Sequence, residues 1–213
     1  MNEIEDQIKW DAYLIPNTNV LNNKLGITNL EELKEKEKEI VRKKLAYLYL
    51  KPIEGNFTLE HLQRVHKFIF DEIYPFAGEL RNCTMQKNTM FCRPEEIKKS
   101  LEETLIEMNS AFNKNIASTS EFAFLLGKYY YELIYVHPFR EGNGRTIRTF
   151  IRDFVVEKSK NMSCGPIDLD YTKIDKNNLL LGTVRRFLYP SMIEMEFMKG
   201  LVPVEKEIIN SKK

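Results

Sequence analysis

Cysteine is scarce in this chain, and the apolar runs of a secreted or membrane protein are missing. The sequence has three cysteines, Cys83, Cys92 and Cys164. A small, odd number predicts a reducing compartment and not a disulfide scaffold. The first residues, MNEIEDQIKW, lack the basic and apolar regions of a signal peptide. No run of about 18 apolar residues occurs, as a membrane-spanning helix would need. We therefore expect a cytoplasmic protein that does not cross a membrane.

An excess of charge of either sign is also lacking. Thirty-two basic residues stand against 31 acidic ones, so the formal net charge is +1. Proteins that bind nucleic acid carry a basic excess over a face or a whole domain. The balance predicts no nucleic-acid partner, and any phosphate binding has to come from local charge. The length of 213 residues is typical of a single globular domain.

Alternating strand patterns are nearly absent, whereas helical spacing recurs along the chain. Asn29 or Thr28 is expected to cap a helix over 30–50, and Thr58 one over 58–74. The EKEKE run inside the first of these indicates a solvated helix face. Further helices are expected over 94–114, 119–135, 142–158, 171–187 and 190–200. The fold class is therefore predicted to be all-α, with one small β-hairpin.

Residues 119–135 are the most apolar of these predicted helices. Their aromatic and aliphatic side chains place them at the centre of the core, with Phe122, Phe124, Leu125, Leu126, Tyr129, Tyr130, Leu133 and Ile134 inside. The domain is predicted to span residues 30–200, between an irregular lead over 1–29 and a frayed tail over 201–213.

The predicted hairpin lies at about residues 80–93. Lys87-Asn88 is a plausible two-residue turn, and pairing about it would set Cys83 opposite Cys92. The two cysteines would then be able to form a disulfide if oxidised, but in a reducing compartment we expect free thiols.

The stretch HPFREGNGRTIR, residues 137–148 and here called the motif segment, concentrates unusual residues. Pro138 disfavours helical backbone at the preceding residue, so the helix before it should end near Val136. Glycines on both sides of Asn143 let the backbone turn and approach a ligand closely. The next helix begins there, and a helix N-terminus offers free N–H groups and a favourable dipole to an anion.

The charged side chains of the motif segment fit the same anion. Arg145 and Arg148 lie on adjacent turns of one helix face and can reach around it together. Glu141 makes sense beside a polyphosphate if it binds Mg²⁺, which uses one or two carboxylates plus substrate phosphates. His137 titrates near neutral pH and can act as a general base. Residue by residue, the alternative of a connector with surface ion pairs stays open. The segment is neither a P-loop nor a dinucleotide fingerprint, because GxxxxGK[ST] is absent and no strand precedes it.

The motif segment resembles the signature of the Fic domain family, His-x-Phe-x-Asp/Glu-Gly-Asn-Gly-Arg-x-x-Arg. Every fixed position is met, by His137, Phe139, Glu141, Gly142, Asn143, Gly144, Arg145 and Arg148. FDEIYPFAGELR and QKNTMFCRPEEI resemble the stretches before and within the family's β-hairpin flap. YLIPNTNVLNNKLGIT resembles the lead of Fic domains in bacterial host-directed effectors and toxins. The resemblance covers about residues 10–190 and implies a Fic-type helical bundle, with a flap over about 80–93.

This resemblance implies an enzyme that transfers AMP from ATP to a hydroxyl side chain of a target protein. His137 would be the general base, and Glu141 would bind Mg²⁺. Gly142, Asn143 and Gly144 would form the anion hole. Arg145 would hold the β-phosphate region and Arg148 the γ-phosphate. The flap, through Thr84, Met85 and Lys87, would bind a target segment as an added strand. A toxin or effector of this kind can be delivered into another cell.

Two comparisons with the family pattern refine this prediction. A kinase-like branch has lysine where Gly144 stands, so the glycine favours nucleotidyl transfer. Many members carry an inhibitory motif, Ser/Thr-x-x-x-Glu-Gly/Asn, whose glutamate pairs with the second arginine. IEGN at 53–56 has Leu50 in place of the hydroxyl residue, Thr28-x-x-x-Glu32 is followed by leucine, and SMIEMEF is one residue out of step. We therefore expect the inhibitor to be a separate, small antitoxin-like protein.

Two other functions stay open beside AMP transfer. The chain could use another nucleotide or a CDP-linked donor, or it could be a non-catalytic nucleotide-binding regulator. His61 and His66 offer no further chemistry at this stage. Their five-residue spacing does not place them on one helix face as a metal pair, so we expect structural roles and no zinc.

Overall fold

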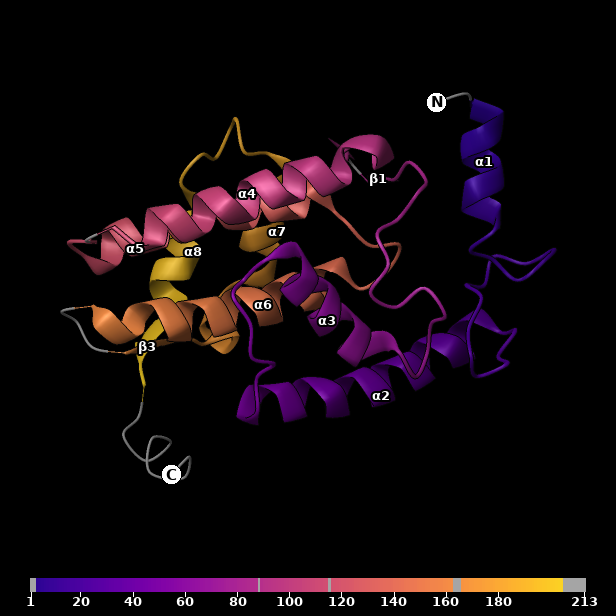
Figure 1. Cartoon of the computed structure of the whole chain (residues 1–213), viewed down its shortest axis with the longest axis horizontal. Helices are drawn as coiled ribbons and strands as arrows, with labels where there is room; N and C mark the ends of the chain where they lie inside the picture. Colours follow the sequence, from indigo (N-terminus) through magenta and orange to yellow (C-terminus); the bar gives the residue numbers. More distant parts are fainter. Residues whose placement is uncertain (1–2, 88, 115, 163–165, 205–213) are drawn as a thin grey trace. The chain divides into compact units, whose positions relative to one another are not determined.

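The computed structural model of the chain describes residues 3–87, 89–114, 116–162 and 166–204. Cys164 lies outside these residues. The chain forms two compact units, one of residues 1–102 with 136–149 and one of 103–135 with 150–213. Helices make up most of the described chain, which confirms the predicted all-α fold class (Figure 1). Among the described residues, no helix has the length and apolar character needed to span a membrane.

The first unit contains the helices α1 (Glu3–Asp11), α2 (Leu30–Leu50) and α3 (Leu59–Phe70). Asn29 caps α2 by accepting the backbone N–H groups of Glu31 and Glu32. Thr58 caps α3 by accepting the N–H of His61. Both starts agree with the prediction, because a side-chain cap is a local signal. Helices α2 and α3 pack side by side.

Helix α1 corrects the prediction of an irregular lead over residues 1–29. None of its residues is buried. Ile4 and Ile8 lie four positions apart but are both exposed, and two aliphatic positions in nine residues are too few to show a helical period. Glu3, Glu5 and Asp6 lie in its first turn and Lys9 in its last, so its charges complement the helix dipole. The remainder of the lead, from residue 12 to 29, has no helix and contains only an isolated bridge between Leu14 and Leu21.

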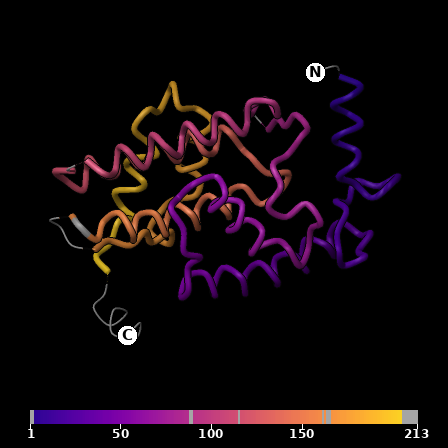
Figure 2. The backbone as a smooth tube through the Cα atoms, in the orientation of Figure 1, coloured from indigo at the N-terminus to yellow at the C-terminus, as the bar shows by residue number. Residues whose placement is uncertain are grey.

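After α3 the chain follows an irregular course, with turns between residues 71 and 78, before α4 (Ile97–Phe112) begins (Figure 2). The hairpin is present as β1 (Gln86–Lys87) and β2 (Thr89–Met90), with Gln86 opposite Met90 and Lys87 opposite Thr89. This register is one residue away from the predicted one, so Lys87 is a strand residue and not a turn residue. Continued outward, it does not set Cys83 opposite Cys92. Both are buried free thiols, as expected.

Two helices are divided between the units. The second unit begins at residue 103, inside α4 (Ile97–Phe112), and again at residue 150, inside α6 (Asn143–Lys158). A 3₁₀ turn at Pro94–Glu96 precedes α4. The second unit includes α5 (Thr119–Val136) up to residue 135. The ring of Phe112 meets those of Phe122 and Phe154 edge-on, at centroid distances of 4.8 and 4.9 Å. Most of the residues predicted to form the core face of α5 are buried. The prediction is wrong for Phe124, which is 59% exposed.

The same unit contains α7 (Lys176–Val184), α8 (Met192–Gly200) and 3₁₀ turns at Ser159–Asn161 and Tyr171–Lys173. It also has a second antiparallel pair, β3 (Ile167–Leu169) with β4 (Leu201–Pro203). A loop was expected for the first of these strands and a frayed tail for the second. Three residues are too few to show a strand period, and the pairing partner lies more than thirty residues away. The rest of the predicted tail, residues 205–213, lies outside the described residues.

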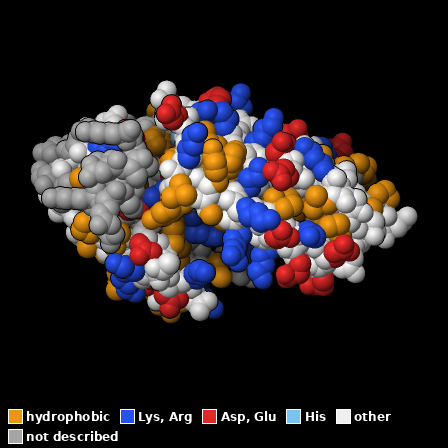
Figure 3. All heavy atoms as spheres, turned by 90° about the horizontal axis from the view of Figure 1, so that it is seen from below, with side chains coloured by type: hydrophobic (Ala, Val, Ile, Leu, Met, Phe, Trp, Pro, Cys, Tyr) orange, Lys and Arg blue, Asp and Glu red, His pale blue; other side chains and the backbone are white. Residues whose placement is uncertain are grey.

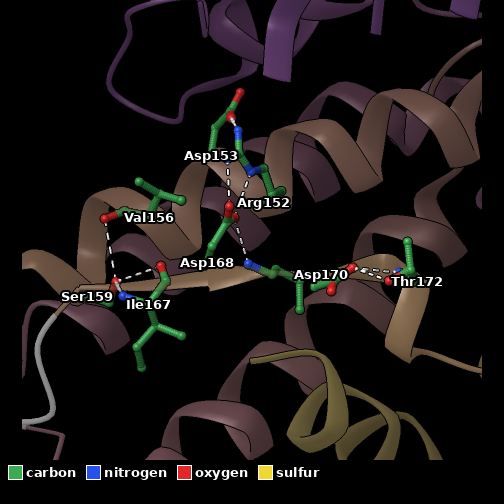
Figure 4. A network of polar contacts seen from close by, with 9 residues as sticks. Arg152, Asp153, Val156, Ser159, Ile167, Asp168, Asp170 and Thr172 are labelled. Carbon is green, nitrogen blue, oxygen red and sulfur yellow. Dashed lines mark hydrogen bonds and ion pairs between the residues drawn. The ribbon is translucent and has the colours of Figure 1, made fainter. Parts of the chain in front are cut away.

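Side chains attach β3 to α6 (Figure 4). The guanidinium of Arg152 donates from Nε and Nη2 to the two oxygens of Asp168, each at 2.7 Å. Ser159 accepts the N–H of Ile167 at 2.8 Å and donates to its C=O at 3.1 Å. These bonds fix the start of a strand whose own ladder is short.

Candidate active site

The motif segment starts where α5 ends, at Val136, as predicted from Pro138. His137 has a positive φ of 47°. Left-handed backbone is unusual for a residue with a side chain and is common just after a helix end. It turns the chain sharply, and the half-buried imidazole stacks on the ring of Phe91 with centroids 3.8 Å apart. The candidate base therefore lies against the residue that follows β2.

Asn143 closes the loop that follows His137. Its Oδ1 accepts the N–H of Phe139 at 2.8 Å, and its Nδ2 donates to the C=O of Phe139 at 2.7 Å. The Phe139 side chain is fully buried. The Asn143 side chain thus braces the loop from the first residue of α6.

His66 on α3 packs against the loop and bonds to it. Its ring stacks on Phe139 at a centroid distance of 3.9 Å. Its Nδ1 accepts the N–H of Gly78 at 2.8 Å, which leaves the proton on Nε2 to donate to the C=O of Glu141 at 3.0 Å. Burial lowers the pKa of His66 to about 4, with a smaller contribution from the charge of Arg145 and against the opposing bond to the C=O of Glu141. The ring is neutral near pH 7, and its role is structural, as expected.

Gly142 and the start of α6 form the candidate anion site. Gly142 has φ +78°, and a Cβ added there would lie 2.2 Å from the ring of Phe70. Its C=O accepts the N–H of Thr146, so the helix starts at once. Helix geometry leaves the N–H groups of the first turn, from Asn143 to Arg145, without intrahelical acceptors. The sequence prediction of a helix N-terminus at the glycines is confirmed.

Arg145 lies between two carboxylates. Its Nη1 donates to Oε1 of Glu37 on α2 at 2.5 Å, and its Nη2 to Oε1 of Glu141 at 3.2 Å. The hydroxyl of Tyr74 donates to the other oxygen of Glu37. The Arg145 guanidinium also lies over the ring of Phe70, 4.8 Å from its centroid. Glu37, Glu141 and the ring of Phe70 therefore hold the guanidinium of Arg145, the side chain predicted to bind phosphate.

Arg148 and Gly144 are close to each other. A Cβ added to Gly144 would lie 3.0 Å from Nη1 of Arg148, so this guanidinium reaches back over the helix start. The structure thus brings the second arginine to the same end of α6 as Gly142, Asn143 and Gly144. Glu141, whose side chain is 42% exposed, also bonds through Oε1 to the N–H of Gly142 at 2.8 Å.

Arg81 connects the flap to the motif segment. This buried guanidinium donates to the C=O of Cys83 and of Cys92, on the two sides of the hairpin, at 2.7 and 2.6 Å. It also donates to the C=O of His137 at 2.7 Å and of Val136 at 3.2 Å. One side chain therefore sets the base of the flap against the candidate catalytic histidine.

The predicted docking residues lie in or next to the first strand of the flap. Lys87 is an exposed residue of β1, while Thr84 and Met85 precede that strand and are half-buried. The N–H of Thr84 is already engaged, since it donates to Oδ1 of Asp6 on α1 at 2.7 Å. Nearby, Trp10 of α1 carries the guanidinium of Arg140 over its ring at 3.9 Å. Helix α1 therefore borders both the flap and the motif segment.

Sequence reasoning missed the residues that support this site. Glu37 is hidden in a run that looks solvated, yet its side chain is 14% exposed. Arg81 and Phe91 gave no local pattern, because their partners are distant in the chain. Arg81 stands between Glu79 and Asn82 in a polar stretch of the sequence, so its neighbourhood gave no signal of its bracing role.

Residues 56–155 match the model of the Fic/DOC family. The chain carries a Fic/DOC family domain. This confirms the resemblance drawn from the motif segment, which lies wholly inside the matched residues.

Two curated relatives of this chain are named as enzymes. Protein adenylyltransferase VbhT of Bartonella schoenbuchensis is 28% identical over 178 residues, which are 83% of this chain and 36% of that protein. The "Probable protein adenylyltransferase Fic" of Salmonella typhimurium is 29% identical over 164 residues, 76% of this chain and 81% of that one. The chain thus spans about a third of VbhT but most of the shorter relative.

Solved structures agree with the family assignment at the level of the fold. The N-terminal Fic domain of a VirB-translocated Bep effector protein from Bartonella quintana, with bound ADP, superposes with a TM-score of 0.81. It is 22% identical, and the match covers 93% of this chain and 98% of that one. BepC from Bartonella tribocorum, with bound AMPPNP, gives a TM-score of 0.77 at 23% identity, over 92% and 98% of the two chains. The Fic-type fold is therefore shared along nearly the whole chain.

Proposed function

We propose that the chain is a protein adenylyltransferase, which moves AMP from ATP to a serine, threonine or tyrosine hydroxyl of a target protein. The observation that carries this proposal is the composition of the motif segment. It brings a histidine, a carboxylate, two arginines and the free N–H groups of a helix start to one end of α6. The names of the curated relatives point the same way.

The proposed roles follow the chemistry of each group. The backbone N–H groups of Asn143 and Gly144 stabilise charge on the phosphate oxygens. Gly142 completes this proposed anion hole through its turn, since its own N–H donates to Oε1 of Glu141. Arg145, already fixed by Glu37, contacts the β-phosphate region, and Arg148 contacts the γ-phosphate. Neither arginine acts as a nucleophile, so their contribution is positioning and charge stabilisation.

Glu141 fits a role as a Mg²⁺ ligand. Its carboxylate is partly exposed and lies beside the phosphate site, and Mg²⁺ typically takes one or two carboxylates together with substrate phosphates. Described residues contain no cluster of three or more acidic, histidine or cysteine side chains that would form a complete protein cage. When bound, Mg²⁺ would neutralise charge on the α- and β-phosphates.

His137 is proposed to accept the proton of the attacking hydroxyl. The hydroxyl oxygen forms a bond to the α-phosphorus, the bond from that phosphorus to the β-phosphate oxygen breaks, and pyrophosphate leaves. The ring of Phe91 and the brace at Arg81 fix the imidazole and its backbone. A base within reach of the hydroxyl contributes about 10²–10⁴-fold to the rate.

The flap is proposed to bind the target segment, with Thr84, Met85 and Lys87 along the docking strand. An inhibitor in trans is also part of the proposal, since the sequence contains no intact inhibitory motif of its own. Delivery into another cell is also part of the proposal, as the Bartonella quintana protein of similar fold is named a VirB-translocated effector.

The proposal is tested by incubating the chain, Mg²⁺ and a cell lysate with ATP labelled at the α- or the γ-phosphate. We expect the chain to add α-label to protein, and to add no γ-label beyond what the kinases of the lysate transfer without it. His137→Ala should lower the chain-dependent α-label by about 10²-fold or more. Parallel reactions with α-labelled GTP, CTP and UTP test other donors. Nucleotide binding with no label transferred above the His137→Ala background would instead support a non-catalytic regulator.

A further inference from the structure

Glu37 makes the longest-range charged contact of the candidate site. It lies on α2, 108 positions before Arg145, and its Oε1 accepts from Nη1 of that arginine at 2.5 Å. Its neighbours in the EKEKE run, Lys36 and Glu39, pair with each other at the exposed surface. Figure 3 shows acidic and basic side chains intermixed over the face that it presents. Glu37 differs from such surface charges because its side chain is 14% exposed.

Tyr74 fixes the orientation of this carboxylate. The tyrosine is buried, and its hydroxyl donates to Oε2 of Glu37. Burial raises the pKa of Tyr74, and the negative charge of Glu37 raises it further, so the hydroxyl keeps its proton and remains a donor. Both oxygens of Glu37 are therefore engaged, one by a neutral donor and one by a guanidinium.

Arg145 is shared unequally between Glu37 and Glu141. The contact to Glu37 is shorter, at 2.5 Å against 3.2 Å for Glu141. It is also better shielded, because the side chain of Glu37 is 14% exposed and that of Glu141 is 42% exposed. Shielding from water strengthens a charged contact. The guanidinium is thus drawn toward α2 and away from the residue proposed to bind the metal.

Because Arg145 is shared by two carboxylates, the charge that remains at Glu141 depends on whether Glu37 is present. Glu37 and Glu141 share the guanidinium of Arg145, so this arginine neutralises Glu141, the more exposed of the two carboxylates, only in part. Without Glu37 the remaining pair would be neutral, and Arg145 would be able to bind both oxygens of Glu141 in a bidentate contact. A carboxylate in such a contact is a poor ligand for Mg²⁺.

We propose that Glu37 is a positioning residue that holds Arg145 and thereby keeps the Glu141 carboxylate available to a magnesium–nucleotide complex. This inference rests on the proposed function for the role of Glu141. It adds Glu37, which lies outside the motif segment, to the residues that shape the candidate site. The neighbouring charged side chains of α2 are exposed to solvent.

The test is calorimetric titration of the purified chain with ATP over a range of Mg²⁺ concentrations, with Glu37→Gln as the variant. Glutamine keeps the shape and removes the charge. We expect the Mg²⁺ concentration for half-maximal enhancement of binding to rise about tenfold or more, as for other residues that support a metal ligand. ATP without Mg²⁺ should bind at least as well as to the wild type, because a negative charge has been removed.

Glu39→Gln is the matched control. It removes a carboxylate from the same helix, but the ion pairs of Glu39 with Lys36 and Lys43 are exposed. It should leave the Mg²⁺ requirement unchanged. Tyr74→Phe removes only the hydroxyl donor to Glu37, and it should shift the requirement in the same direction by a smaller factor. This second variant serves if Glu37→Gln fails to fold.

Thermal unfolding of the same variants separates positioning from stability. A lower unfolding midpoint with an unchanged Mg²⁺ requirement would make Glu37 merely structural and overturn the inference. Glu141→Gln separates the inference from the proposed function. If Glu141→Gln leaves the Mg²⁺ requirement unchanged, the proposed metal role fails. If Glu141→Gln changes it and neither Glu37→Gln nor Tyr74→Phe does, only the inference fails.

Discussion

His137 and Gly142 both hold positive φ angles, +47° and +78°, five positions apart in the motif segment. For histidine this backbone is costly, by an amount on the order of 1 kcal/mol or more, and it persists only where the surroundings enforce it. Here Arg81 bonds to the C=O of His137 and Asn143 braces Phe139. The glycine at 142 is required twice, once by its φ angle and once by the approach of Phe70. Single residues therefore set the shape on which the proposed chemistry depends.

Gly142→Ala should destabilise the chain by about 1–3 kcal/mol or more, because alanine is strained at this φ and its Cβ would meet a buried ring. Gly144→Ala is the matched comparison. Gly144 has no positive φ, and its added Cβ would meet only the mobile end of Arg148, so we expect a change in stability under about 1 kcal/mol. Urea unfolding of the two variants measures the difference. Equal losses would show that Phe70 gives way easily.

At the scale of elements, the site depends on side chains that join segments distant in sequence. Arg81 connects both sides of the hairpin to the end of α5, and His66 connects α3 to the loop before α6. In the second unit Arg152 and Asp168 connect α6 to β3. Short strands and loops with few ladder bonds thereby gain fixed positions from a few well-placed polar groups.

Arg81→Met should loosen the flap, because four backbone carbonyls lose their donor in a buried place, each at a cost of about 1 kcal/mol or more. Cys83 and Cys92 are 0% and 3% exposed, so their reaction with a thiol reagent reports the loosening. In a Cys164→Ser background we expect a faster reaction for Arg81→Met than for the parent. The exposed Arg93→Met is the control. Unchanged thiol protection in Arg81→Met would contradict the bracing role.

Asp168→Asn should cost the chain about 1–3 kcal/mol, because the largely buried guanidinium of Arg152 loses its two-point carboxylate partner and keeps the longer contact to Asp153, at 3.5 Å. Asp170→Asn is the comparison, since Asp170 is exposed and accepts only from Thr172 nearby. We expect it to cost under about 1 kcal/mol. Chemical denaturation at neutral pH measures both. A loss for Asp168→Asn no larger than that of Asp170→Asn would mean that the α6–β3 connection adds little.

For the whole molecule, the sequence predicted what local signals control. Caps at Asn29 and Thr58, the helix end at Pro138 and the glycine-marked start of α6 are all read within a few residues. It did not predict β3, β4, α1 or the shift of the hairpin register, because these depend on contacts that carry no short period. In the candidate site, too, the sequence did not predict contacts between distant residues. The motif segment was recognised whole, while Glu37 and Arg81 act over separations that only the folded chain reveals.

Acid should destabilise the whole chain through its buried histidines. His61 accepts the N–H of Phe57 at Nδ1 and bonds the C=O of Ile53 through Nε2. Burial lowers its pKa despite the bond to Ile53, and the pKa of His66 falls to about 4. The unfolded chain therefore binds more protons below pH 6.5, and the free energy of unfolding should fall as the pH drops from about 6.5 towards 4.

For His66, a decrease of the pKa from 6.5 to about 4 corresponds to at most about 3 kcal/mol over this range. Glutamine can keep one donor and one acceptor but does not titrate. His61→Gln and His66→Gln should each be less stable than the wild type at pH 7 and lose less stability on acidification, and the double variant should have the flattest profile. Urea unfolding at several pH values between 4 and 7.5 measures these slopes. Profiles of the variants parallel to the wild type would assign the acid sensitivity to carboxylates instead.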